Sequence, residues 1–175
     1  MTYLDLVRLP EDGNRHEIID GEWYMTPPPT TDHQLVVAKI IYLLSAHVRP
    51  RKLGGVMVGP GVYFGRHDCV EPDVVYLLAR RKALRKRAYI RGGPDLVVEV
   101  LSPTTESVDR GRKLPLYRDR GVSEYWIVNT ANRTGEVYEF GPLRKRSVFQ
   151  EGQTFKSAAV KDLQVDVDEI FSVLE

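Results

Sequence analysis

Two short apolar segments that each carry one carboxylate constrain this chain more than any other feature. Residues 71–78 read EPDVVYLL and residues 95–101 read DLVVEVL. Runs of this length, rich in β-branched residues and bounded by Pro or Gly, predict buried strands. Asp73 stands at the start of the first run, and Glu99 is embedded between valines in the second. A buried ionised carboxylate costs several kcal/mol unless it is paired or binds a metal, so the fold must supply one or the other.

A divalent cation is the natural partner for such a pair of carboxylates. Neighbouring strands lie about 4.8 Å apart, so Asp73 and Glu99 at matched strand levels would share one hard cation. Oxygen ligands completed by water favour Mg²⁺ or Mn²⁺. Such an ion polarises a phosphoryl oxygen and lowers the pKa of a bound water, which predicts chemistry on a phosphate ester.

Three side chains downstream recur at intervals of four residues: Asp109, Lys113 and Tyr117. In a helix within residues 106–120 they share one face, from which Lys113 would reach the strand ends and assist a reaction at phosphorus. The alternative is an ordinary Asp-Lys pair on the surface, the commoner use of this spacing. Pro115 predicts a kink in this helix, because its ring clashes with the carbonyl four residues earlier.

The remaining elements predict a mixed β-sheet flanked by helices and preceded by a β-hairpin. The hairpin is expected at residues 16–25, around Asp20-Gly21, and the first long helix at residues 32–49. The basic stretch 79–93 is either a helix or a mobile loop. The other expected elements are one bent or two short strands at 54–64, strands at 73–78, 95–101, 124–129, 134–140 and 145–150, and a terminal helix at 167–174.

Composition excludes several classes of protein. The 175 residues suit one domain, residues 1–175, and a hydrophobic fraction of 42% with a net charge of +1 excludes a disordered chain. A single cysteine, Cys69, excludes an intrachain disulfide and a cysteine zinc site, and we expect it to be half-buried. The chain has no apolar run long enough for a membrane span and no leader pattern at its start, which predicts a cytoplasmic protein.

A case for a nucleic-acid partner must come from local charge, since the whole molecule is nearly neutral. The best candidate is the basic run between the two carboxylate strands, although a solvated charged surface would give the same pattern. No helix-turn-helix, zinc finger or other base-reading module is present. The run contains Arg80, Arg81, Lys82, Arg85, Lys86, Arg87 and Arg91.

The ordered set of motifs resembles the Uma-two family of restriction endonucleases, within the PD-(D/E)XK nuclease superfamily. The set is Pro72-Asp73, VVEVLSP at 97–103, the Asp109-Lys113-Tyr117 series and GVSEYWIVN at 121–129. The resemblance covers most of the chain, from HEIIDG at 16–21 onward. It implies a restriction-endonuclease-like fold.

The same resemblance implies a role for several residues. Asp73 and Glu99 would ligate the metal, with the main-chain carbonyl of Val100 as a further ligand. Glu17 resembles an additional acidic residue near the metal, and His33 is matched near the start of the first helix. The lysine that the superfamily places two residues after the Glu is Leu101 here, and Lys113 would replace it.

Several of these residues also have an ordinary structural alternative. Glu17 could be a surface carboxylate before a tight turn. His33 could be exposed or simply hydrogen-bonded at a helix N-terminus. Tyr117 could be a core residue with a satisfied hydroxyl instead of a contact to phosphate, and Trp126 is expected in the core.

The sequence therefore predicts a Mg²⁺-dependent (or Mn²⁺-dependent) endonuclease that hydrolyses phosphodiester bonds of duplex DNA. A homodimer is expected by analogy, since cutting two strands suits two sites related by a twofold axis. One alternative is a catalytically inactive nuclease-fold module that binds DNA or protein, because fold does not fix function. Another is a metal-dependent hydrolase of small phosphoesters.

Overall fold

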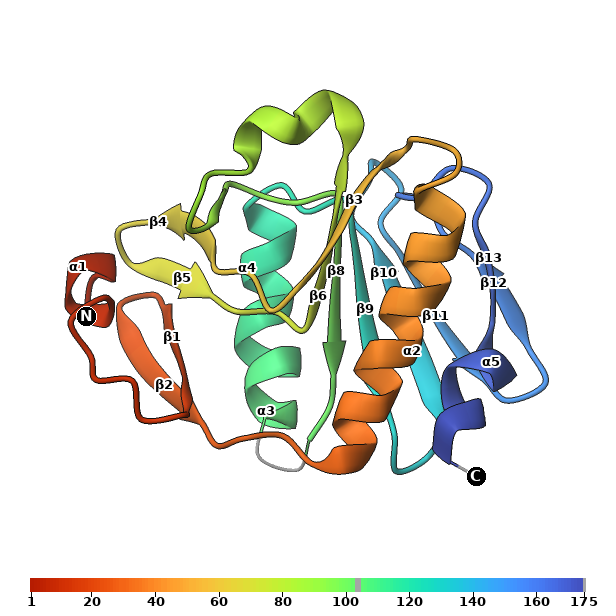
Figure 1. Ribbon diagram of the computed structural model, residues 1–175, viewed down its shortest axis with the longest axis horizontal. Helices are drawn as coiled ribbons and strands as arrows, with labels where there is room; N and C mark the ends of the chain where they lie inside the picture. Colours follow the sequence, from red (N-terminus) through yellow and green to blue (C-terminus); the bar gives the residue numbers. More distant parts are fainter. Residues whose placement is uncertain (103–104, 175) are drawn as a thin grey trace.

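A computed structural model of the chain describes residues 1–102 and 105–174, so that Pro103 of the VVEVLSP motif lies outside it. Its centre is a six-stranded sheet in the order β11-β10-β9-β8-β6-β3 (Figure 1). β8 and β9 are parallel, and the other neighbours are antiparallel, so the predicted mixed sheet is confirmed. The strands are β3 (Gly54–Val58), β6 (Val74–Leu78), β8 (Leu96–Val100), β9 (Glu124–Asn129), β10 (Thr134–Glu139) and β11 (Lys145–Gln150).

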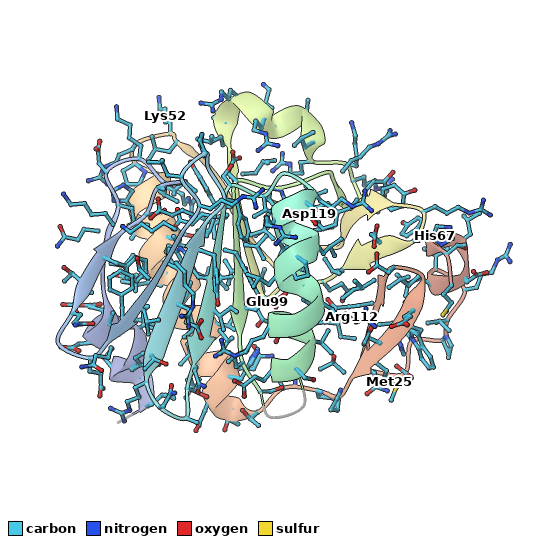
Figure 2. All side chains as sticks on the ribbon, turned by 180° about the vertical axis from the view of Figure 1, so that it is seen from behind. Met25, Lys52, His67, Glu99, Arg112 and Asp119 are labelled. Carbon is cyan, nitrogen blue, oxygen red and sulfur yellow. The ribbon has the colours of Figure 1, made fainter. Side chains whose placement is uncertain are left out.

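Alternation along β8 directs its side chains to two different layers. Val98 and Val100 pack in the core beneath α2 (Thr31–Val48), whereas Val97 packs in the core on the opposite face. That second face is covered by one continuous helical segment, seen in front of the sheet in Figure 2. The segment consists of α3 (Glu106–Val108), a π-helical turn η2 (Asp109–Lys113) and α4 (Leu114–Asp119).

The helical segment contains a π-helical turn just before Pro115, where the sequence predicted a kink. The backbone N–H of Leu114 donates to the carbonyl of Asp109, five residues earlier. Pro115 has no N–H, and its ring would clash with the carbonyl of Gly111 in a regular α-helix. The wider turn relieves that clash, and such turns are frequent at functional sites.

A second sheet of short strands, in the order β2-β1-β5-β4-β7, lies beside the N-terminus of the chain (Figure 1). The predicted hairpin is confirmed, with positive φ at Asp20 (53°) and Gly21 (79°) in its turn. Residues 54–64 form two strands, and these belong to different sheets. Cys69 is fully buried in β5, so the expectation of a half-buried residue was wrong. The strands are β1 (Arg15–Ile19), β2 (Glu22–Thr26), β4 (Val62–Gly65), β5 (Asp68–Val70) and β7 (Ile90–Arg91).

The C-terminal segment packs against α2 and completes the core on that face. Trp126 of β9 is buried there, edge to face with Phe155, as expected. The strand pair β12–β13 was not predicted. No helix within the described ranges is long and apolar enough to cross a membrane. The remaining elements are α1 (Tyr3–Leu6), the 3₁₀-helix η1 (Ala79–Leu84), β12 (Thr154–Lys156), β13 (Gln164–Asp166), α5 (Val167–Phe171) and the 3₁₀-helix η3 (Ser172–Leu174).

Candidate active site

Asp73 and Glu99 meet at one end of the central sheet. The antiparallel register pairs Val74 of β6 with Val98 of β8, so the next pair outward sets Asp73 opposite Glu99. The backbone N–H of Asp73 lies 3.3 Å from Oε2 of Glu99, to which it donates. Both side chains are at most 3% exposed. The two carboxylates of the sequence hypothesis are therefore direct neighbours in a buried setting.

Three donors hold the carboxylate of Asp73. Its Oδ2 accepts from Nε2 of His33 (3.1 Å) and from the backbone N–H of Val100 (2.8 Å), and its Oδ1 accepts from Arg15 (2.9 Å). Burial raises the pKa of Asp73, but the hydrogen bond and charge of His33 together with Arg15 outweigh burial and lower it below the ordinary value. His33 is thus buried and hydrogen-bonded rather than exposed.

Glu99 accepts two hydrogen bonds from the helical segment. Its Oε1 lies 3.0 Å from Nζ of Lys113 and 2.8 Å from the hydroxyl of Tyr117. Tyr117 is fully buried, and this bond satisfies its hydroxyl, as in the core alternative for this residue. Leu101, at the superfamily's usual lysine position, packs in the hydrophobic core.

Lys113 is surrounded by carboxylates. Besides Glu99, its Nζ lies 2.9 Å from Oε1 of Glu17 and 3.3 Å from Oδ1 of Asp109. Lys113 and Asp109 are only 3% and 2% exposed, so a surface pair is excluded for them. Burial lowers the pKa of Lys113, but the three carboxylates outweigh it and hold the pKa well above the ordinary value. Lys113 is therefore a buried cation in an acidic cluster.

The environments of the two strand carboxylates push their pKa values apart. Burial raises the pKa of Glu99 to about 8, although Lys113 opposes the shift, and burial also raises the pKa of Asp109. Asp73, by contrast, stays acidic. Two neighbouring carboxyl groups with opposite shifts are typical of sites that bind cations or move protons.

Glu17 and Glu71 extend the acidic cluster. Glu17 is 2% exposed, and its Oε1 accepts from the backbone N–H of Glu71 (2.8 Å), so the surface alternative for Glu17 was wrong. Glu71 is half-buried, and burial raises the pKa of its carboxyl. Glu71 and Arg15 were not selected from the sequence. Glu71 could have been selected, because it lies only two residues before Asp73. Arg15 could not, because nothing in the sequence distinguishes it from a surface arginine.

These groups line one cleft with a volume of about 430 Å³. Its size suits a small ligand or a segment of a polymer. The connection from β2 to α2, residues 26–30, forms part of its wall. The ionisable residues that line it are Arg15, Glu17, His33, Glu71, Asp73, Glu99, Asp109 and Lys113.

The donor set of this cleft suits a hard cation. The acidic side chains in the cleft outnumber its two cationic ones, Lys113 and Arg15. Within the described ranges, Oδ1 of Asp109 has no hydrogen-bond partner, because its contact with Lys113 lacks hydrogen-bond geometry. Carboxylate oxygens are what Mg²⁺ and Mn²⁺ prefer. Across residues 1–102 and 105–174, no group of three or more His, Cys, Asp or Glu side chains is arranged to hold a metal ion. The predicted set needs only two such side chains, Asp73 and Glu99, with the Val100 carbonyl.

The arrangement of sheets and helices is that of a known nuclease-like fold. A crystal structure described as "a putative nuclease belonging to DUF820" from Anabaena variabilis superposes with a TM-score of 0.85, covering 100% of this chain and 99% of that one. The two sequences are 20% identical, so this likeness concerns the fold. The predicted restriction-endonuclease-like fold class is thereby confirmed.

Residues 3–168 match the Uma2 family, described as "Putative restriction endonuclease", and the chain belongs to this family. The resemblance drawn from the sequence motifs is therefore confirmed. The chain is also 28% identical over 131 residues to "Uncharacterized protein slr1290" of Synechocystis sp.. That match covers 71% of this chain and 65% of the relative, slightly less than two thirds of the relative's length.

Proposed function

We propose that this chain is a Mg²⁺- or Mn²⁺-dependent nuclease that hydrolyses phosphodiester bonds of DNA in the cleft. The observation that carries the proposal is the contact between Asp73 and Glu99, with Lys113 bonded to Glu99, inside a cleft lined by further carboxylates. Membership of the Uma2 family supports the same class of reaction.

In this proposal Asp73 and Glu99 hold the cation together with the Val100 carbonyl. When bound, the cation supplies positive charge to the phosphate and lowers the pKa of water. His33 and the Val100 N–H fix one oxygen of Asp73, and Tyr117 fixes one oxygen of Glu99. These three contacts keep the two carboxylates in place without rearrangement.

Lys113 and Glu17 complete the proposed site. Lys113 contacts Glu99 and Glu17 at once, so it ties the hairpin carboxylate to the strand carboxylate. In the reaction its charge would stabilise negative charge that develops on the phosphate. Arg15 contacts Asp73 and is 27% exposed in its side chain, so it is the cation best placed to meet an entering phosphate.

The test is nicking of supercoiled plasmid in Mg²⁺ or Mn²⁺ by the parent, Asp73→Asn and Glu99→Gln. Glu124→Gln is the matched control, because Glu124 is a fully buried strand carboxylate that does not line the cleft. We expect both site variants to lose at least about a hundredfold in rate while the control keeps its activity, with circular dichroism reporting the fold of each. Equal nicking by all four proteins would indicate a contaminating nuclease and refute the proposal.

One observation favours the binding-only alternative. Lys113 is buried and its Nζ contacts three acidic side chains, while Leu101 occupies the position of the superfamily's usual lysine. The role of Lys113 could therefore be structural only. A protein that binds duplex DNA but nicks it in neither metal would match that alternative. Hydrolysis of bis(p-nitrophenyl) phosphate without plasmid nicking would instead indicate a small-phosphoester hydrolase. A homodimer stays a prediction, which sedimentation velocity can check.

A further inference from the structure

The basic run of the sequence lies at the far end of the central sheet from the cleft. Asp73 precedes β6, whereas η1 begins directly after Leu78, the last residue of β6. Six residues of extended chain, at about 3.3 Å each, separate Asp73 from Ala79 by about 20 Å. Figure 1 shows η1 and the start of α3 at opposite ends of the sheet. The run therefore cannot contact a phosphate that is bound in the cleft.

A second basic segment joins it at this end. The connection from α2 to β3 carries Arg49, Arg51 and Lys52, and Leu53 accepts a hydrogen bond from the backbone N–H of Ala79 (2.9 Å). Figure 2 shows Lys52 at the same end of the molecule as η1, away from Glu99. We define the basic end as the exposed residues Arg49, Arg51, Lys52, Arg80, Lys82, Arg85, Lys86 and Arg87.

The charge of the basic end is not neutralised by the protein. Residues 49–67 and 79–94 contain no Asp or Glu. Within the described ranges, none of the eight side chains forms an ion pair, whereas Arg112, Arg118, Arg120 and Arg146 elsewhere on the surface each contact a carboxylate. Arg81 is the neighbour that does pair, with Asp95, and it is not one of the eight. Eight clustered cations repel one another, so a partner that supplies negative charge would stabilise them.

We infer that the basic end binds the sugar-phosphate backbone of a nucleic acid at a position remote from the cleft. The large apolar side chains that are exposed on this protein lie elsewhere, none of them in residues 49–53 or 79–88, so the described surface here has no anchor for a lipid bilayer and no aromatic core for a protein interface. Phosphate contacts by Arg and Lys need neither. The partner is therefore a regular polyanion, bound without regard to its base sequence.

This inference rests on the proposed function and deepens it by setting a substrate length. A duplex rises 3.4 Å per base pair, so about 20 Å corresponds to at least about six base pairs between the cleaved phosphate and the first contact at the basic end. A polymer that extends this far gains affinity from both ends of the molecule. A phosphodiester that fills only the cleft gains nothing from the basic end.

The experiment compares two quadruple variants that lower the net charge equally. One replaces four residues of the basic end (Lys82→Gln, Arg85→Gln, Lys86→Gln, Arg87→Gln), and the control replaces four exposed residues elsewhere on the surface (Arg8→Gln, Arg66→Gln, Arg112→Gln, Lys156→Gln). Fluorescence anisotropy with a labelled duplex of about 30 base pairs, in EDTA and about 50 to 200 mM salt, gives affinity and salt dependence.

We expect the basic-end variant to bind the duplex at least about tenfold more weakly. The slope of log K against the logarithm of the salt concentration should become shallower by up to about 3.6, because up to four phosphate contacts are lost. The control variant should bind as the parent does. Equal weakening of both variants would show an effect of net charge alone and overturn the inference. Binding of the parent to anionic phosphatidylserine vesicles, with no binding to the duplex, would overturn it as well.

Activity separates this inference from the proposed function. The basic-end variant should hydrolyse bis(p-nitrophenyl) phosphate at the parental rate while nicking plasmid more slowly at moderate salt. Duplex binding that depends on the basic end, without nicking by any variant, would refute the nuclease and keep the binding surface. If the parent nicks plasmid and the basic-end variant binds and nicks as well as the parent does, the binding surface is refuted and the nuclease is kept.

Discussion

Replacing Glu99 by Gln should change how the stability of the protein depends on pH in metal-free buffer. Burial raises the pKa of Glu99 in the folded protein to about 8, from an ordinary value of 4.5. The folded state thus holds a proton that the unfolded state releases. A carboxyl group of this kind contributes its stability fully below its unfolded pKa, and the contribution is lost as pH rises through its folded pKa.

The size of the effect follows from that difference in pKa. One pKa unit corresponds to about 1.4 kcal/mol, so the contribution of Glu99 to the free energy of unfolding falls by at most about 4–5 kcal/mol between roughly pH 4.5 and pH 8. Glu99→Gln removes the titration and leaves an amide of similar shape. The amide oxygen of the variant still accepts from Lys113 and Tyr117. The amide nitrogen takes the place of Oε2, so the Asp73 N–H loses its acceptor, and that bond was the weakest of the three.

The assay is urea unfolding of the parent and Glu99→Gln in EDTA at several values of pH from about 5 to 8.5. The variant should be slightly less stable than the parent at the acidic end and more stable at the basic end. Ile127→Val in the adjoining strand is the control, because it changes core packing without removing an ionisable group. A difference between parent and Glu99→Gln that stays constant across this range, like that of the control, would refute the reasoning.

Three further predictions concern buried groups. Lys113→Met should lower the free energy of unfolding by about 3–5 kcal/mol at neutral pH, because the buried acidic cluster of Glu17, Glu99 and Asp109 loses its cation. An undiminished thermal midpoint would contradict this. Glu124→Ala should cost about 2–4 kcal/mol in urea unfolding, since the Trp126 indole and the Ala159 N–H lose their acceptor, and parental stability would show that these bonds add nothing. Burial raises the pKa of the Cys69 thiol to about 12, so DTNB should label it only after unfolding, and rapid labelling of native protein would contradict that environment.

The meeting of Asp73 and Glu99 was predictable because its cause is local. A carboxylate inside a short apolar run must find a partner, and two such runs close in sequence form neighbouring strands of one sheet. The register that sets the residues opposite each other depends on their antiparallel pairing, which the runs alone do not specify. Lys113 was found by its spacing from Asp109, but its burial follows from the packing of the whole helix on the sheet.

The residues that the sequence did not reveal come from contacts between distant segments. Arg15 lies 58 positions from Asp73, and nothing in its neighbours distinguishes it. The second sheet was missed as a unit because β5 and β7 have three and two residues, too few to show an alternating pattern. Its strands are held by pairing with the hairpin and by the core they share with α4 rather than by their own propensity.

The position of the basic run shows how strand direction separates what the sequence places together. Arg80 is only seven positions after Asp73, and in the printed sequence the run lies directly between the two carboxylate strands. A chain that enters β6 at the cleft must leave it at the other end, since an extended strand advances about 3.3 Å with each residue. β6 therefore sets the distance between an acidic cleft and a cationic surface. If both contact one nucleic acid, as we propose, the length of this strand fixes the shortest substrate that reaches them together.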